Sequence, residues 1–309
     1  MAEEEPAVSV VIPVATAGTF TRDCLQSVLR SVADFDGGSE VILVLNGLGT
    51  AEREILAPVL AHPKARPVER PERMGSAPAR CLGISLARGR CVLLTDADCL
   101  VPVDWVRQMG KAAARDGVVS GQVQAANGVL NAYVRVQQEI DRVRNSAVNR
   151  LGARRYPTVA NMAAQRGLLT HLVDDPRNTT EDIQLSLEFQ SRGIKVGNVE
   201  RAVVRTIYPA SLRESVSRQG KHALGVAFVQ KLWSRRQWRR LGMAGPLALA
   251  AAGFIRIWQM RLSLHERMIA LALRLCFAAQ WAFYLVMPMR CARQRQAEPE
   301  IGHRQQPTH

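Results

Sequence analysis

VSVVIPV, at residues 8–14, is an almost unbroken run of apolar and mostly β-branched residues. Such a run is typical of a strand buried on both faces of a parallel sheet, because an exposed face would require alternating polar residues. Two further runs repeat the pattern, EVILVL at 40–45 and CVLLT at 91–95, and helically spaced apolar residues fill 21–32 and 77–87. This alternation predicts an α/β fold with a Rossmann-like, doubly wound parallel sheet over residues 8–125.

The composition allows a large core. The chain has 309 residues, of which 47% are hydrophobic and 22% charged, which excludes a disordered chain and a small disulfide scaffold. Residues 1–200 hold 23 basic and 23 acidic side chains, whereas residues 201–309 hold 18 basic and 4 acidic ones. A neutral body with a basic tail does not favour a nucleic-acid partner. Six cysteines without a CxxC pair and an acidic N-terminus predict a catalytic part in the cytoplasm.

An acidic pair, Asp96 and Asp98, directly follows the predicted strand at 91–95. Ligands of open parallel sheets bind at the carboxyl ends of the strands, where a change in strand order leaves a crevice. Two carboxylates one residue apart can share Mg²⁺ or Mn²⁺, which prefer oxygen ligands and bridge to phosphates. We therefore expect a divalent metal here, although an acidic surface turn is the alternative.

A second acidic pair, Glu181 and Asp182, opens a helix that the pattern predicts over 180–192. Acids at this position can simply complement the helix dipole. Opposite a metal-bound donor, however, one of them could act as the general base that deprotonates an acceptor hydroxyl.

These segments together resemble the family 2 glycosyltransferases of GT-A fold. The resemblance covers roughly residues 8–230 and rests on VSVVIPV, EVILVLNG, RMGSAPARCLGISLARGRCVLLTDAD, NMAAQRG and TTEDIQLSLEFQSRG, in that order. It implies an inverting enzyme that uses a sugar nucleotide, with a catalytic domain over residues 8–230.

The resemblance also implies roles for single residues. The donor would be bound by Pro13, Ala15, Thr16, Asn46, Arg80 and Asp96. Asn46 stands where the family often has an Asp, and Arg80 follows Gly75 in the stretch GSAPARCLG, in which Cys81 replaces the usual Asn. Asp98, with Asp96, would bind the metal, Asp182 would be the base beside Glu181, and Asn161 would line the acceptor side.

A basic helix predicted over 212–233 could neutralise the pyrophosphate through Arg218, Lys221 and His222. It resembles the family's Gln-x-x-Arg-Trp element only loosely, because no Arg-Trp is present. A solvated cationic helix face is the alternative.

The last third contains two apolar runs, residues 241–255 and 268–289. The second, at 1.5 Å per residue, would be about 33 Å long and so match a bilayer core. Arg and Trp residues flank both runs, as in segments that anchor to a cytoplasmic membrane surface. We expect residues 231–290 to form a helical, membrane-associating segment that places the enzyme at the cytoplasmic face of the cell membrane, and residues 291–309 to form a polar tail. A pair of soluble helices packed on the catalytic domain is the alternative.

The sequence thus predicts a metal-dependent, inverting glycosyltransferase of hexosyltransferase type. It would move a sugar from a nucleoside-diphosphate donor to a hydroxyl of a glycan or lipid-linked acceptor, in cell-surface glycan or glycolipid synthesis. A nucleotidyltransferase acting on a sugar phosphate and a non-catalytic nucleotide-sugar binding protein are the alternatives.

Overall fold

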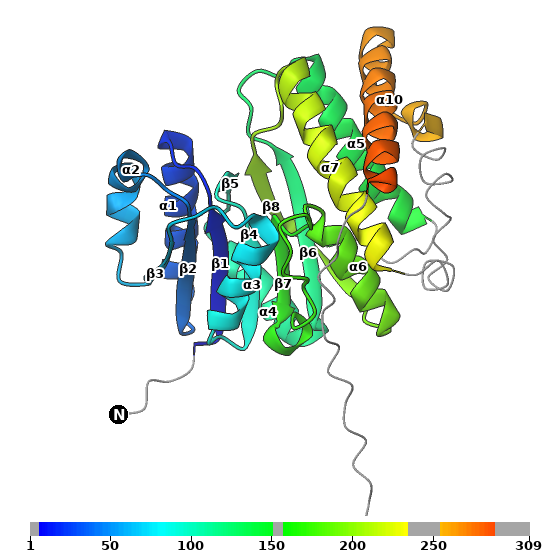
Figure 1. Ribbon diagram of the computed structural model, residues 1–309. Helices are drawn as coiled ribbons and strands as arrows, with labels where there is room; N and C mark the ends of the chain where they lie inside the picture. Colours follow the sequence, from blue (N-terminus) through cyan, green and yellow to red (C-terminus); the bar gives the residue numbers. More distant parts are fainter. Residues whose placement is uncertain (1–5, 151–156, 234–253, 288–309) are drawn as a thin grey trace, which may run out of the picture.

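The computed structural model describes residues 6–150, 157–233 and 254–287. In these residues the chain forms one eight-stranded sheet with helices on both faces (Figure 1). The strands are β1 (Val8–Val14), β2 (Ser39–Asn46), β3 (Ala65–Arg70), β4 (Cys91–Thr95), β5 (Cys99–Leu100), β6 (Val118–Ala125), β7 (Asn161–Gln165) and β8 (Val196–Thr206). The helices are α1 (Thr19–Ala33), α2 (Thr50–Leu60), α3 (Ser76–Leu86), α4 (Trp105–Asp116), α5 (Ala132–Arg150), α6 (Glu181–Ser191), α7 (Leu212–Leu232) and α10 (Leu264–Val286), with a short 3₁₀ helix at Arg166–Leu168.

The first half of the sheet is parallel, as the apolar runs predict. Its strand order is β3-β2-β1-β4, with Val8 paired to Ser39 on one side and to Cys91 on the other. The chain therefore moves outward from β1 to β3 and then returns to the opposite side of β1. This reversal leaves the crevice expected of a doubly wound sheet between the carboxyl ends of β1 and β4.

Beyond residues 8–125, for which the parallel sheet is predicted, the sheet becomes mixed, because β7 lies antiparallel between β4 and β6. β6 and β8 are parallel to each other, and β5 pairs antiparallel with the end of β8. The register of β6 against β8 shifts between Ser120 and Gln122. Gly121 lies at this register shift, and a Cβ atom there would lie 2.3 Å from Asn161 Nδ2. Only glycine therefore leaves room for the side-chain amide of Asn161 in β7.

The core has one layer on each face of the sheet. Val10, Ile12 and Val14 of β1 pack with residues of α1 and α4, whereas Val11 packs on the other face with residues of α3 and α6. Both faces of β1 are buried, which explains its continuous apolar sequence.

A third group of helices, α5, α7 and α10, covers the end of the sheet at β6 and β8 (Figure 1). α10 packs along α7, where Ala223, Ala227 and Trp281 form a small buried cluster. Its first half contacts α5 and the short segment after residue 254 through Val136, Ala270 and Leu273. Most of the apolar run predicted at 241–255, the Arg and Trp residues at 235–240 and the polar tail at 291–309 lie outside the described residues.

The close packing of α3 on the sheet makes a testable prediction. A Cβ atom on Gly83 would lie 2.3 Å from Val11 Cγ1, which is fully buried. We expect Gly83→Ala to lower the free energy of unfolding by about 1–3 kcal/mol, as overpacking usually does, measured by urea denaturation. Gly128→Ala, whose Cβ would meet nothing within 4 Å, is the control. Without the clash, alanine would instead raise the free energy of unfolding by about 1 kcal/mol, because it favours the helix more than glycine does. Such an increase would contradict the close packing of α3 on β1.

Candidate active site

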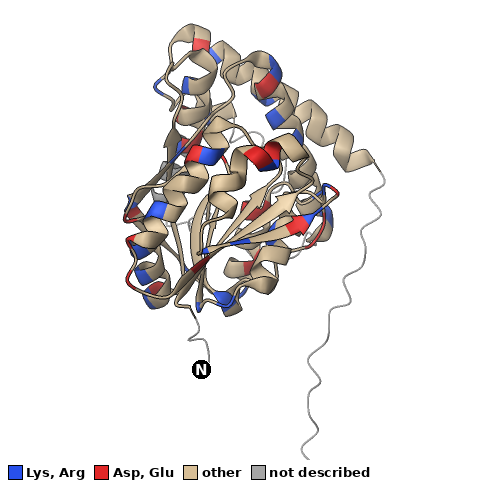
Figure 2. Cartoon of the chain, turned by 90° about the vertical axis from the view of Figure 1, so that its left-hand side faces the viewer, with Lys and Arg blue, Asp and Glu red and all other residues tan. Residues whose placement is uncertain are grey.

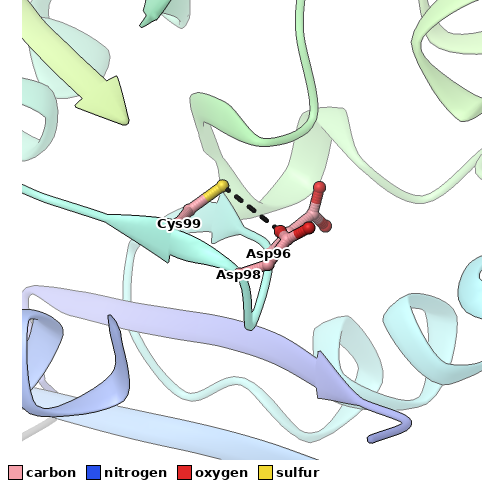
Figure 3. A group of neighbouring side chains, drawn as sticks. All are labelled: Asp96, Asp98 and Cys99. Carbon is pink, nitrogen blue, oxygen red and sulfur yellow. Dashed lines mark hydrogen bonds between the residues drawn. The ribbon is translucent and has the colours of Figure 1, made fainter. Parts of the chain in front are cut away.

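The acidic pair lies at the carboxyl end of β4, beside the crevice between β1 and β4. Figure 3 shows Asp96 and Asp98 on the turn that joins β4 to β5, with their carboxylates close together. Together with the Cys99 thiol, their ligand atoms lie within 4.8 Å of one another. The strand-end position predicted for the pair is therefore confirmed.

The donor set at this turn fits a hard divalent cation. Loss of solvent around its carboxyl group and, second, the charge of Asp96 raise the pKa of Asp98, although the residue as a whole is exposed. A cation between the two carboxylates would relieve this repulsion. Burial raises the pKa of the Cys99 thiol well above its usual range, and a hard divalent cation prefers the carboxylate oxygens to sulfur.

Arg80 connects the two acidic segments of the site. The residue is 3% exposed, and its guanidinium forms an ion pair with Asp96 through Nη2 and a 2.5 Å bond from Nη1 to Glu181 Oε1. Burial opposes the charge on Arg80, but Glu181 and Asp96 outweigh it and raise its pKa. Both arms of the guanidinium thus bind protein carboxylates, and the direct nucleotide contact that the sequence resemblance implies for Arg80 stays a prediction.

The second acidic pair opens α6, as predicted, with Thr180 at the N-cap position. Glu181 is buried and held by Arg80, whereas Asp182 is half-buried and accepts a 2.9 Å bond from the Ile183 amide. The charge of Asp182 also acts on Arg80. Three carboxylates, those of Asp96, Glu181 and Asp182, therefore act on one buried guanidinium, and Asp182 is the more accessible of the two on α6.

The residues predicted to border the nucleobase lie on loops at the same edge of the sheet. Pro13 is in β1, and Ala15 and Thr16 follow it, with Thr16 exposed. Asn46 ends β2, but its buried amide donates to Gly75 O and accepts from the Met74 amide. Asn46 therefore holds the loop before α3, and a role in reading the base stays a prediction.

Asn161, which the resemblance places on the acceptor side, is buried inside the sheet. It has 0% exposed surface, and its side chain donates to Gln122 O and Ala202 O, each at 2.8 Å, while accepting from Trp105 Nε1 at 2.9 Å. These bonds satisfy main-chain carbonyls next to the irregularity of β6. Its contacts are those of a structural residue at the centre of the sheet.

The basic residues of α7 occupy different surroundings. Arg218 is exposed, lies 5.5 Å from the centre of the Tyr208 ring, and its charge favours the ionised form of Asp98. Lys221 is exposed, and its carbonyl accepts a bond from Thr179 Oγ1 just before α6. His222 packs against Phe277 of α10. Of the three, Arg218 is the one whose charge reaches the acidic pair.

The sequence reading missed Arg73 as a site residue. Its Nη2 donates to the carbonyl of Ala15 at 2.6 Å and so ties the loop before α3 to the loop after β1. The residue stands in the stretch RMGSAPAR that carries the family resemblance, which was the available signal.

Comparisons with known proteins agree with this geometry. A family model described as Glycosyl transferase family 2 matches residues 9–174. An N-acetylglucosaminyltransferase of Rhizobium meliloti (strain 1021) is 24% identical over 294 residues, which are 86% of this chain and 64% of the relative. The putative glycosyltransferase EpsH of Bacillus subtilis (strain 168) is 30% identical over 110 residues, 36% of this chain and 31% of the relative. The chain thus spans less than two thirds of either curated relative.

Two solved structures share the fold. The mannosyltransferase PcManGT from Pyrobaculum calidifontis, in complex with GDP-Man and Mn²⁺, has a TM-score of 0.62 and 18% identity and covers 92% of this chain and 88% of its own. Glucosyl-3-phosphoglycerate synthase from Mycobacterium tuberculosis, in complex with phosphoglyceric acid, has a TM-score of 0.54 and 20% identity, with 78% and 82% covered. These similarities confirm the predicted GT-A fold.

The family match extends from β1 through the acidic pair to the loop before α6 and includes more than half of the residues. On this ground the chain belongs to glycosyl transferase family 2.

Proposed function

We propose that the chain transfers a sugar, with inversion, from a nucleoside-diphosphate donor to a hydroxyl of an acceptor. The observation that carries this proposal is that Arg80, near the carboxyl end of β4, binds both Asp96, whose neighbour is Asp98, and Glu181, whose neighbour is Asp182. Inversion needs a base on one side of the sugar and charge neutralisation of the leaving diphosphate on the other. The two acidic pairs supply these two sides.

On the donor side, the loops after β1 and β2 would bind the nucleoside, and Asp96 and Asp98 would hold Mg²⁺ or Mn²⁺. When bound, the metal would neutralise charge on the diphosphate as it leaves. Arg218, whose charge reaches Asp98, would add a second positive group on this side. A structural neighbour solved with GDP-Man and Mn²⁺ supports this arrangement.

On the acceptor side, Asp182 would take the proton from the attacking hydroxyl. Glu181 is less suited to this step, because it is buried and its Oε1 already accepts a bond from Arg80. The acceptor would be a glycan or a lipid-linked sugar.

The other two hypotheses are less well supported. A nucleotidyltransferase would need a glycine-rich, Arg- or Lys-bearing first loop, and the stretch PVATAGTF, from the end of β1 to the start of α1, has neither Arg nor Lys. A binding protein without catalysis would not need two acidic pairs facing one another. Release of nucleoside diphosphate from a sugar nucleotide distinguishes the transferase from both.

The proposed location is the surface of a membrane, reached through α10 and the segment before it. Among the described residues, α10 is the one helix long and apolar enough to cross a bilayer, and only 17% of its most apolar window is buried. Its outer face exposes Leu264, Met268, Leu275, Phe283 and Val286, and Trp258 is exposed nearby. Figure 2 shows that the end of this helix, which leads into the grey trace, carries no charged residue.

Contacts between α10 and the rest of the protein favour lying on the membrane over crossing it. Arg135 of α5 forms a 2.8 Å ion pair with Glu266, and Lys231 of α7 donates to the carbonyls of Tyr284 and Met287 at the end of α10. Crossing the bilayer would break these bonds or draw charged helices into hydrocarbon. We therefore propose a catalytic domain over residues 8–230, a surface-binding segment over residues 231–290 and a polar tail over residues 291–309, at the cytoplasmic face.

The acidic pair predicts a metal-dependent step in nucleotide binding. We expect Asp98→Asn to abolish the Mn²⁺-dependent part of GDP or UDP binding, measured by calorimetry with Mn²⁺ and with EDTA, because the variant removes one of two charged ligands. Asp116→Asn, an exposed Asp at the end of α4, is the control and should bind like the wild type. Equal affinity of the wild type in Mn²⁺ and in EDTA would remove the metal role.

The position of Asp182 predicts a catalytic defect without a binding defect. Asp182→Asn should lower the release of nucleoside diphosphate from a sugar nucleotide by about 10²–10⁴, the usual contribution of a general base, with GDP or UDP affinity nearly unchanged. Glu188→Gln, on the same helix, is the control. A rate close to that of the wild type would place the base elsewhere.

The exposed face of α10 predicts binding to anionic vesicles. Flotation at low salt should bring the full chain up with vesicles containing phosphatidylglycerol, and high salt should weaken this binding because basic residues attract the lipid headgroups. Replacing both Leu275 and Phe283 by Glu should abolish it. Ile55→Glu, at an exposed apolar position on α2 at the other end of the sheet, should not. A chain that stays in the aqueous fraction at low salt would favour the alternative of soluble packed helices.

A further inference from the structure

Arg80 has a position unlike that of any other cation described in the structure. Its side chain is almost fully buried, yet it reaches carboxylates from two segments that are distant in sequence, Asp96 after β4 and Glu181 at the start of α6. Asp96 belongs to the donor and metal side of the proposed site, and Glu181 to the acceptor side. We propose that Arg80 is a positioning residue that fixes these two sides relative to each other, a role that rests on the proposed function.

The backbone that carries Arg80 is itself held from two directions. Gly83 lets α3 approach β1 so closely that a Cβ atom would lie 2.3 Å from Val11 Cγ1. Gly75, at φ +94°, precedes α3, where a Cβ atom would lie 3.0 Å from Pro176 Cα in the loop that leads to α6. α3 is thus packed closely against the sheet and against the segment that precedes Glu181. The Arg80 guanidinium therefore has little freedom to move towards Asp96 or Glu181 alone.

The charges require a bridging cation at this place. Asp96 and Glu181 end on the same buried guanidinium, and a carboxylate oxygen of Asp98 lies within 4.8 Å of one of Asp96. Without a positive group between them, the two acidic pairs would repel one another across the site. With Arg80 in place, Asp96 keeps one oxygen on the guanidinium and can offer the other to a metal. The metal-side carboxylate is therefore oriented by the same side chain that holds Glu181.

The fork of the guanidinium matters as much as its charge. Nη1 and Nη2 bind different carboxylates, and a single ammonium at the end of a lysine cannot reproduce two divergent donors. Arg80→Lys therefore keeps the charge and removes the bridge. Glu181→Gln keeps the shape of the second partner and removes its charge, without touching Asp96.

The experiment compares these two variants, their double variant and Arg66→Lys. Arg66 pairs with Glu40 and Leu86 O near the amino end of β2, away from the site, and serves as the control. Mn²⁺ binding is titrated by electron paramagnetic resonance in the presence of GDP or UDP, which requires no turnover. Release of nucleoside diphosphate and the melting temperature are measured on the same samples.

We expect Arg80→Lys to weaken Mn²⁺ binding about 10–100-fold, as loss of a group that orients a metal ligand usually does, and to lower the rate as well. Glu181→Gln should also weaken Mn²⁺ binding, because Arg80 is then drawn towards Asp96, and the double variant should be no worse than Arg80→Lys. Arg66→Lys should leave the metal affinity and the rate unchanged. If Arg80→Lys does not fold, the effect of Glu181→Gln on Mn²⁺ affinity decides.

Wild-type Mn²⁺ affinity in a folded Arg80→Lys variant would overturn the proposal, and so would a change confined to the melting temperature. Wild-type Mn²⁺ affinity in Glu181→Gln would overturn it as well. A wild-type chain that releases nucleoside diphosphate from no sugar nucleotide would instead contradict the proposed function. The metal titration would still decide the role of Arg80 in that case.

Discussion

The site depends on one buried ionic contact, the guanidinium of Arg80 between Asp96 and Glu181. Acidic side chains from separate segments do not gather at one edge of a sheet without a compensating charge, because their repulsion grows as the surroundings exclude water. Arg80 provides that charge from inside the protein, and Arg218 provides some of it from α7. The remaining excess of negative charge is what makes the edge suited to a divalent cation and, through it, to a diphosphate.

The parts of the fold that follow from local sequence could be predicted. The bounds of β1 and β4 agree with the runs VSVVIPV and CVLLT, because a strand buried on both faces is mostly apolar. The position of β7 could not be predicted, because it depends on pairing with strands far away in sequence. Asn161 in β7 resembles a site residue by motif, yet its amide bonds are needed inside the sheet. A motif specifies which residue types are present, but it does not specify which groups each side chain binds in the folded protein.

The same distinction holds within the candidate site. The acidic pairs were predictable because each directly follows or opens a regular element whose end faces the crevice. The partners of Arg80 were not predictable, because they lie 16 and 101 residues away and meet only after α3, β4 and α6 have packed. α7 connects this site to the apolar helix α10: a Cβ atom on Gly225 would lie 2.7 Å from Thr180 Oγ1 before α6, while Ala223 and Ala227 pack with Trp281. α7 thus packs both against the start of α6, which carries the proposed base, and against α10, which carries the proposed membrane-binding face.

The most direct test of this account is a crystal structure of the chain with Mn²⁺ and a nucleoside diphosphate, with the metal located by its anomalous scattering. We expect an anomalous peak between Asp96 and Asp98 at the carboxyl end of β4, with the diphosphate on the metal and Arg80 still bound to Asp96 and Glu181. A metal bound elsewhere, or an Arg80 side chain that has left both carboxylates to bind the diphosphate, would contradict it.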